Sequence, residues 1–128
     1  MDTPYLTVHW NEEIKCVWME WKKFVKGAGF RNGLDKGLEL IIAKESSKWL
    51  ADLTRLKVVD MEDQEWSNND WFPRAIEGGI QWMAIVVPED IFAKMSVNSI
   101  MEKVPTMQLT VHYFDSLHEA EDWLRAPH

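Results

Sequence analysis

The start of the chain has the pattern of a β-hairpin, with two strand-like stretches on either side of a polar segment. Residues 5–10 are rich in β-branched and aromatic side chains, and residues 14–21 have the same character. A short polar segment, residues 11–13, separates the two stretches. The pattern predicts two antiparallel strands joined by a tight connection.

A helical period follows the glycine-containing break at residues 27–29. Apolar side chains recur three or four positions apart between Phe30 and Ile42, while charged residues occupy the other faces. Gly33 and Gly37 lie four residues apart in this stretch, where each glycine costs up to about 1 kcal/mol against alanine. We infer that these glycines let the helix approach a sheet closely.

The middle of the chain contains two nearly continuous apolar stretches, residues 49–53 and 81–87. Such stretches are typical of central strands covered by helices. Between them, the acidic run at residues 60–65 precedes a predicted helix over residues 66–77, whose positive end the carboxylates complement. Pro73 either interrupts this helix or begins a second turn of it.

The last third of the chain predicts a helix, a strand and a terminal helix. An apolar stripe at helical spacing covers residues 97–104 and is closed by Pro105. Residues 107–114 have the composition of a strand. Ser116 and Glu119 then have the spacing of a capping box at the start of a helix.

The resulting order is ββαβαβαβα. Strands that alternate with helices imply an α/β fold with a mostly parallel sheet, right-handed crossovers and one antiparallel strand from the hairpin. The length of 128 residues matches one typical domain, so we expect a single domain over residues 1–128.

Composition and charge narrow the location and the partners. The single cysteine, Cys16, rules out an internal disulfide and fits a reducing compartment. The longest apolar stretch, residues 82–87, is far shorter than the ~20 residues of a membrane span. The net charge of −7 disfavours binding to a nucleic-acid backbone. We expect a cytoplasmic protein with no transmembrane segment and no nucleic-acid partner.

The residues that could carry catalysis are few. His9, His112 and His118 lack metal-ligand spacing, and Cys16 in a strand is interpreted as a small buried hydrophobe. The carboxylates of residues 60–65 lack an apolar surround that would separate their pKa values, so we interpret them as a hydrated helix start. We expect no enzyme activity, no catalytic residue, no metal and no cofactor.

Four segments of the chain carry a resemblance to a known family. They are Trp49-Leu50-Ala51-Asp52-Leu53-Thr54, Trp66 through Pro73-Arg74-Ala75 to Gly79, Ala84-Ile85-Val86-Val87-Pro88, and Tyr113-Phe114-Asp115 with Glu119-Ala120 and Trp123-Leu124. With the element order, they resemble the SpoIIAA-like proteins. This STAS-type group has a fold often placed with the lipid-binding lobe of Sec14-like proteins. The resemblance implies a mixed, mostly parallel five-stranded sheet with about four helices, and a regulatory or protein-interaction role.

The chain departs from the family at one functional position. Anti-sigma antagonists of this type carry a phosphorylatable serine in an Asp-Ser-Ser-Gly-like turn that starts the second helix. The matching stretch, residues 62–65, holds neither hydroxyl nor glycine, so we expect no kinase-operated switch at that turn. The carboxylates there could imitate phosphoserine, but a role at a helix N-terminus is the simpler interpretation.

Five residues are candidates for binding a ligand or partner: Asp52 and Thr54 in the first matching segment, and Trp66, Trp71 and Arg74 in the second. Eight tryptophans are many for a domain of this size, so we do not expect all of them in the core. Trp66 and Trp71 lie among polar residues and are the hardest to bury together. Three functions stay open. They are a protein-interaction module, a carrier or sensor of a lipid or small apolar ligand, and a structural homodimer.

Overall fold

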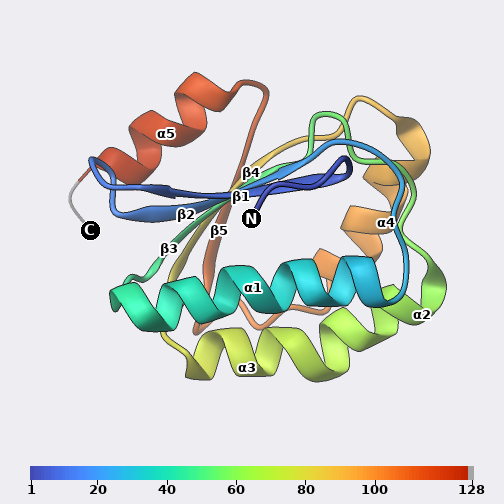
Figure 1. Cartoon of the computed structure of the whole chain (residues 1–128), viewed down its shortest axis with the longest axis horizontal. Helices are drawn as coiled ribbons and strands as arrows, with labels where there is room; N and C mark the ends of the chain where they lie inside the picture. The colour runs from blue at the N-terminus through green and yellow to red at the C-terminus, as the bar shows by residue number, and fades with distance from the viewer. Residues whose placement is uncertain (127–128) are drawn as a thin grey trace.

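The computed structural model describes residues 1–126, which form a five-stranded sheet with helices on both faces (Figure 1). The strands lie side by side in sequence order, and only β1 and β2 are antiparallel. The strands are β1 (Leu6–Asn11), β2 (Cys16–Trp21), β3 (Lys48–Asp52), β4 (Trp82–Val86) and β5 (Thr110–Phe114). The predicted hairpin and the mostly parallel sheet are confirmed.

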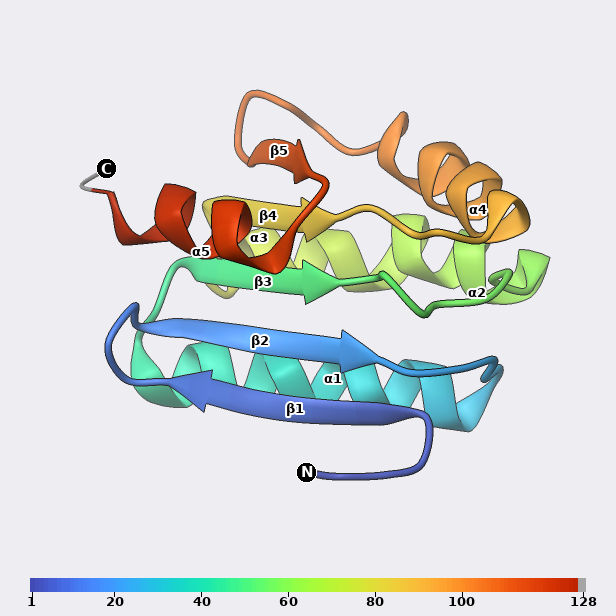
Figure 2. The ribbon, with the colours of Figure 1, turned by 90° about the horizontal axis from the view of Figure 1, so that it is seen from above.

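The helices cover the two faces of the sheet unequally. The helices are α1 (Ala28–Lys44), α2 (Met61–Trp66), the π-helix η1 (Ser67–Trp71), α3 (Phe72–Glu77), α4 (Ile91–Met101) and α5 (Leu117–Arg125). Of these, α5 lies on one face and all the others lie on the opposite face (Figures 1 and 2). Because α2, η1 and α3 follow one another without a break, they act as one helical unit. The predicted order ββαβαβαβα is confirmed.

The central strands contribute side chains to two separate cores. Successive side chains of a strand point to opposite faces, so the apolar stretches of β3 and β4 divide between the faces. Trp49 and Ile85 pack in the larger core under α1 to α4, whereas Leu50 and Ala84 pack against α5. The sequence-based interpretation of these stretches as strands covered on both sides is confirmed.

Two glycines bring α1 close to the sheet, as predicted. A methyl group added at Gly37 would lie 2.4 Å from a ring carbon of Trp49. One added at Gly33 would lie 2.4 Å from a methyl carbon of Leu6. A side chain at either position would fit only if neighbouring side chains of the larger core shifted.

The predicted start of the second helical unit at residue 66 is wrong, because α2 begins at Met61. The carboxylate of Asp60 accepts a hydrogen bond from the backbone N–H of Glu62 and caps the helix, so the acidic run lies within the first turns. Pro73 is near the start of α3, so it begins a further turn and does not end the helix. Phe72 is the residue before Pro73, and its N–H donates to the carbonyl of Ser67 five residues back. This bond makes the intervening turn a π-turn.

The fourth helix and the last strand also differ from the predicted bounds. α4 begins at Ile91, not at residue 97, and Asp90 caps it by accepting from the N–H of Ala93 at 2.9 Å. β5 begins at Thr110, not at residue 107. The terminal helix starts as predicted, since the hydroxyl of Ser116 accepts from the N–H of Glu119.

Candidate functional site

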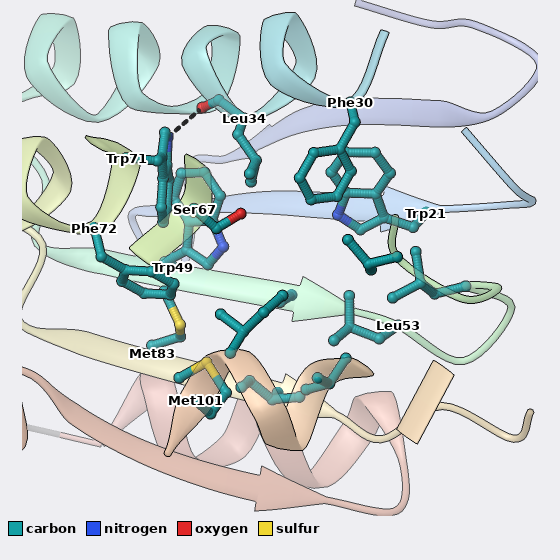
Figure 3. A pocket seen from close by; sticks show the side chains of 16 residues that line it. Trp21, Phe30, Leu34, Trp49, Leu53, Ser67, Trp71, Phe72, Met83 and Met101 are labelled. Atoms are coloured by element: carbon teal, nitrogen blue, oxygen red, sulfur yellow. Dashed lines mark hydrogen bonds between the residues drawn. The ribbon is translucent and has the colours of Figure 1, made fainter. Parts of the chain in front are cut away.

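An apolar cavity of about 80 Å³ lies between the sheet and the helices of the larger face (Figure 3). Its lining comes from α1, β2, β3, β4, η1, α3 and α4, with the loop that follows β3. The lining residues are Trp21, Phe30, Leu34, Trp49, Ala51, Leu53, Leu56, Val59, Ser67, Trp71, Phe72, Met83, Ile85, Val97, Ile100 and Met101. The hydroxyl of Ser67 already donates to the carbonyl of Asp63 at 2.8 Å. The remaining surface of the cavity suits an apolar group.

The π-helix η1 forms one wall of this cavity and connects it to two helices. The indole N–H of Trp71 donates to the carbonyl of Leu34 in α1 at 3.1 Å (Figure 3). The side-chain amide of Asn68 donates to the carbonyl of Ile100 in α4 at 2.9 Å. These two bonds hold η1 between α1 and α4. Trp71 is 1% exposed, so of the two candidate tryptophans it is the one that faces the interior.

A groove of about 420 Å³ lies on the outer side of the same region, between α2 and α4. Its lining includes large apolar side chains that are unusually exposed: Met61 at 66%, Phe92 at 62%, Met95 at 60% and Val58 at 44%. Ile91, beside Phe92 in sequence, is 65% exposed. The charged residues of the lining are Glu65, Glu102 and Lys103. We call this surface the α2–α4 groove.

The groove was not predicted from the sequence. The apolar stripe in the sequence of α4 marks its buried side, and the exposed apolar residues of the helix lie outside that stripe. Met61 and Phe92 are also far apart in sequence, and the pattern within either helix does not show that they meet. The signal available was the apolar character of residues 91–95 beyond what one buried face requires.

Asp63 is buried, and for this residue the prediction of a hydrated acidic run is wrong. Its carboxylate is 1% exposed. It accepts hydrogen bonds from the backbone N–H of Gly27 at 2.8 Å and from Nε of Arg31 at 3.0 Å. Asp63, Ser67 and Trp71 repeat every four residues and are all buried. A helical period traced backwards from Trp71 would have placed Asp63 inside.

Two guanidinium groups lie near the half-buried ring of Trp66. The Cζ atoms of Arg31 and Arg74 are 5.5 and 5.7 Å from its ring centroid. Arg74 donates to Asp35 at 2.8 Å and to Asp70 at 2.7 Å, and these carboxylates, Asp35 foremost, raise the pKa of its guanidinium. Both carboxylates compete with any anionic ligand. The structure thus brings Trp66 and Arg74 together, and their contacts with Arg31 and Asp35 link the α2–α3 unit to α1.

Asp52 and Thr54 form a turn at the carboxyl end of β3. One carboxylate oxygen of Asp52 accepts from the hydroxyl of Thr54 at 2.7 Å and from its backbone N–H at 3.2 Å. The carbonyl of Thr54 accepts from the N–H of Glu89 at 3.2 Å, which ties the turn to the loop after β4. The turn lies at the end of the sheet, whereas Trp66 and Arg74 pack on α1, so the five predicted residues do not form one site.

The predicted environment of Cys16 is confirmed. Cys16 is 1% exposed in the core under α5. Burial raises the pKa of its thiol to about 12, and the charge of Glu121 adds to the rise. The thiol therefore stays protonated and unreactive near neutral pH.

Two histidines stack on tryptophans at opposite margins of the sheet. His9 on β1 lies 4.3 Å from Trp18, and His112 on β5 lies 4.6 Å from Trp123, both measured between ring centroids.

Within residues 1–126, no three His, Cys, Asp or Glu side chains gather in a way that would hold a metal ion. None of the helices in that range is long and apolar enough to cross a membrane.

Comparisons with known proteins agree with this architecture. The crystal structure of an uncharacterized DUF3478-family protein with a SpoIIAA-like fold, from Shewanella loihica PV-4, is similar with a TM-score of 0.64. The alignment covers 97% of this chain and 98% of that one at 13% sequence identity, so the two proteins share a fold. No curated protein matches the chain in sequence. The family model described as SpoIIAA-like matches residues 16–125, and the chain therefore belongs to the SpoIIAA-like family.

Proposed function

We propose that this chain is a one-domain, cytoplasmic and non-enzymatic module of the STAS type that regulates a protein partner. In this proposal the partner presents a basic amphipathic helix, which binds in the α2–α4 groove. The observation that carries the proposal is the exposed apolar lining of that groove, where Met61, Phe92 and Met95 are each at least 60% exposed.

The lining suits the apolar stripe of a helix. A helix that binds in a groove does so through side chains at positions i, i+3, i+4 and i+7. Burying exposed apolar surface gains roughly 25 cal/mol per Å² before the cost of association is subtracted. Two of the groove residues, Met61 and Met95, have flexible side chains that adapt to different partners.

The charge around the groove favours a basic partner. Glu65 and Glu102 line it against the single ammonium of Lys103, and the whole chain carries a net charge of −7. Lysines flanking the apolar stripe of the partner would be attracted to these carboxylates, and salt would weaken the complex.

Fluorescence anisotropy tests the proposal with two labelled helical peptides. One has a leucine stripe flanked by lysines, and the other has glutamates in place of the lysines. We expect the basic peptide to bind more tightly, with an affinity that falls as salt is added. Met95→Glu in the protein should weaken this binding at least tenfold, since burying a carboxylate against the leucine stripe of the peptide costs more than its attraction to the flanking lysines returns.

Met107→Glu is the matched control, because Met107 is 98% exposed but lies outside the groove. It should bind the basic peptide as the unsubstituted protein does. Equal binding of the two peptides, or equal binding by the Met95→Glu and Met107→Glu proteins, would contradict the proposal.

The cavity behind η1 supports a second candidate function, the binding of a small apolar ligand. At about 80 Å³ it is smaller than the ~150 Å³ cavities known to bind benzene, so only a short apolar group fits without movement of the helices.

Thermal melts in the presence of xenon test this candidate. The gas should raise the melting temperature of the unsubstituted protein, and Ala51→Val, which fills the cavity, should reduce the rise. An equal melting temperature with and without xenon would exclude this function.

A further inference from the structure

β5 forms one margin of the sheet, and no residue of the range 1–126 bonds to its outward backbone groups. It pairs with β4 on its inner side (Figure 2). The N–H of Thr110 donates to the carbonyl of Gln81, and the carbonyl of Phe114 accepts from the N–H of Val87, both at 2.9 Å. In a parallel ladder alternate residues bond to the same neighbour, so Thr110 and Phe114 face β4. Val111 and Tyr113 therefore direct their N–H and C=O groups away from the sheet.

The opposite margin is protected by the chain itself. The N–H of Val8 on β1 donates to the carbonyl of Met1 at 2.8 Å, and the carbonyl of Leu6 accepts from the N–H of Thr3 at 2.8 Å. Within residues 1–126, β5 has no such covering segment bonded to its outer side. Natural sheets guard open edges with charged residues or proline, yet residues 110–114 contain neither.

We propose that the open edge of β5 binds the same edge of a second copy of this chain, in antiparallel orientation. Centred on His112, the pairing places Val111 of each copy opposite Tyr113 of the other. Each such pair exchanges two N–H···O=C bonds, so the four outward donors and acceptors of each strand are satisfied. The same surface serves both copies, which is the geometry of a two-fold dimer.

Side chains and charges agree with this register. Val111 and Tyr113 form a cross-strand pair of a β-branched and an aromatic residue, a favoured combination. Tyr113 is 50% exposed and gains burial on pairing. Asp115, the first charged residue after β5, comes opposite Leu109 of the other copy, so no two carboxylates face each other across the pairing. The two sheets join into one of ten strands.

Light scattering coupled to size-exclusion chromatography tests the proposal. The unsubstituted protein should approach twice its chain mass of 15.0 kDa as its concentration rises through the micromolar range. Tyr113→Pro removes an outward N–H that β4 does not use, and proline is accepted on an edge strand of this kind. This variant should stay monomeric with an unchanged circular dichroism spectrum, while Tyr113→Thr, which keeps the amide, should still dimerise.

Hydrogen exchange supplies a measurement that does not depend on a variant. In the unsubstituted protein, the amides of Val111 and Tyr113 should exchange more slowly at high than at low protein concentration. A monomer at every concentration, or exchange at these amides that is independent of concentration, would overturn the proposal. So would a dimer that Met95→Glu abolishes, because that result would assign the contact to the α2–α4 groove.

Discussion

At the scale of single residues, the carboxylate of Asp63 links three parts of the fold. It lies in α2, accepts from the N–H of Gly27 before α1 and pairs with Arg31 within α1. Gly27 has a φ of +65°, a conformation that glycine adopts without strain. This buried carboxylate stabilises the fold because it satisfies two donors. Its removal would leave both donors without their partner.

Asp63→Ala is expected to destabilise the protein by about 2 kcal/mol, because it leaves one charged and one backbone donor without an acceptor. Asp63→Asn, which keeps one acceptor oxygen, should cost less. Glu62→Ala is the control: this neighbour is exposed, and its loss should change the free energy of unfolding by no more than about 0.5 kcal/mol. Urea denaturation measures all three, and equal costs for Asp63→Ala and Glu62→Ala would refute the assigned role.

Cys16 provides a prediction about chemical reactivity. Its thiol is 1% exposed, with a pKa of about 12, so the reactive thiolate is scarce and inaccessible in the folded protein at pH 8. Because burial raises this pKa from 9.0 to about 12, the contribution of Cys16 to stability is fully present below the unfolded pKa and is lost as the pH rises from there through the folded pKa. Ellman's reagent should react very slowly with the folded protein and rapidly in urea. Fast reaction without denaturant would show that the α5 face opens readily.

At the scale of elements, the contact of α1 with the sheet depends on glycines that lower the intrinsic stability of the helix. Gly37→Ala should gain up to about 1 kcal/mol of helix propensity. The added carbon would nevertheless lie 2.4 Å from the buried ring of Trp49 and 2.8 Å from the sulfur of Met19. Since overpacking a core costs about 1–3 kcal/mol, we expect net destabilisation.

The matched control for Gly37→Ala is Asn32→Ala, on the exposed side of the same helix. That substitution improves helix propensity without adding a core contact, so it should be neutral or slightly stabilising. Thermal denaturation compares the two variants. A Gly37→Ala protein as stable as the Asn32→Ala protein would show that α1 can move away from the sheet at little cost.

Helices differ in how completely their sequence predicts them. The stripes of α1 and α5 were predictable because each helix buries one face and exposes the other. α4 was predicted only in its second half, because Phe92 and Met95 are apolar and exposed. The π-turn of η1 comes directly before Pro73, and the sequence indicates that an irregularity occurs there but not which form it takes.

At the scale of the whole molecule, the hydrophobic patterns along the chain predict the order of the elements and a mostly parallel sheet, and the four matching segments point to the family. Patterns with periods of 2 and 3.6 report which side of an element is buried, and a fold of packed layers follows from that information. The candidate sites depend on elements that are far apart in sequence, since Met61 of α2 and Phe92 of α4 line the same groove. The sequence places Asp52 and Arg74 in two different segments, and the structure shows that the end of β3 and the α1–α3 contact are separate places.

The two cores share their central strands, and this predicts a single cooperative unfolding transition. Leu50 packs against α5, while its neighbour Trp49 on β3 packs under α1, so losing one core removes support from the other. Leu50→Ala on one face and Leu38→Ala on the other should each cost about 2–5 kcal/mol. In both variants, tryptophan fluorescence and far-ultraviolet circular dichroism should report the same urea midpoint. If Leu50→Ala separated the two midpoints, α5 and its core would unfold independently of the rest of the sheet.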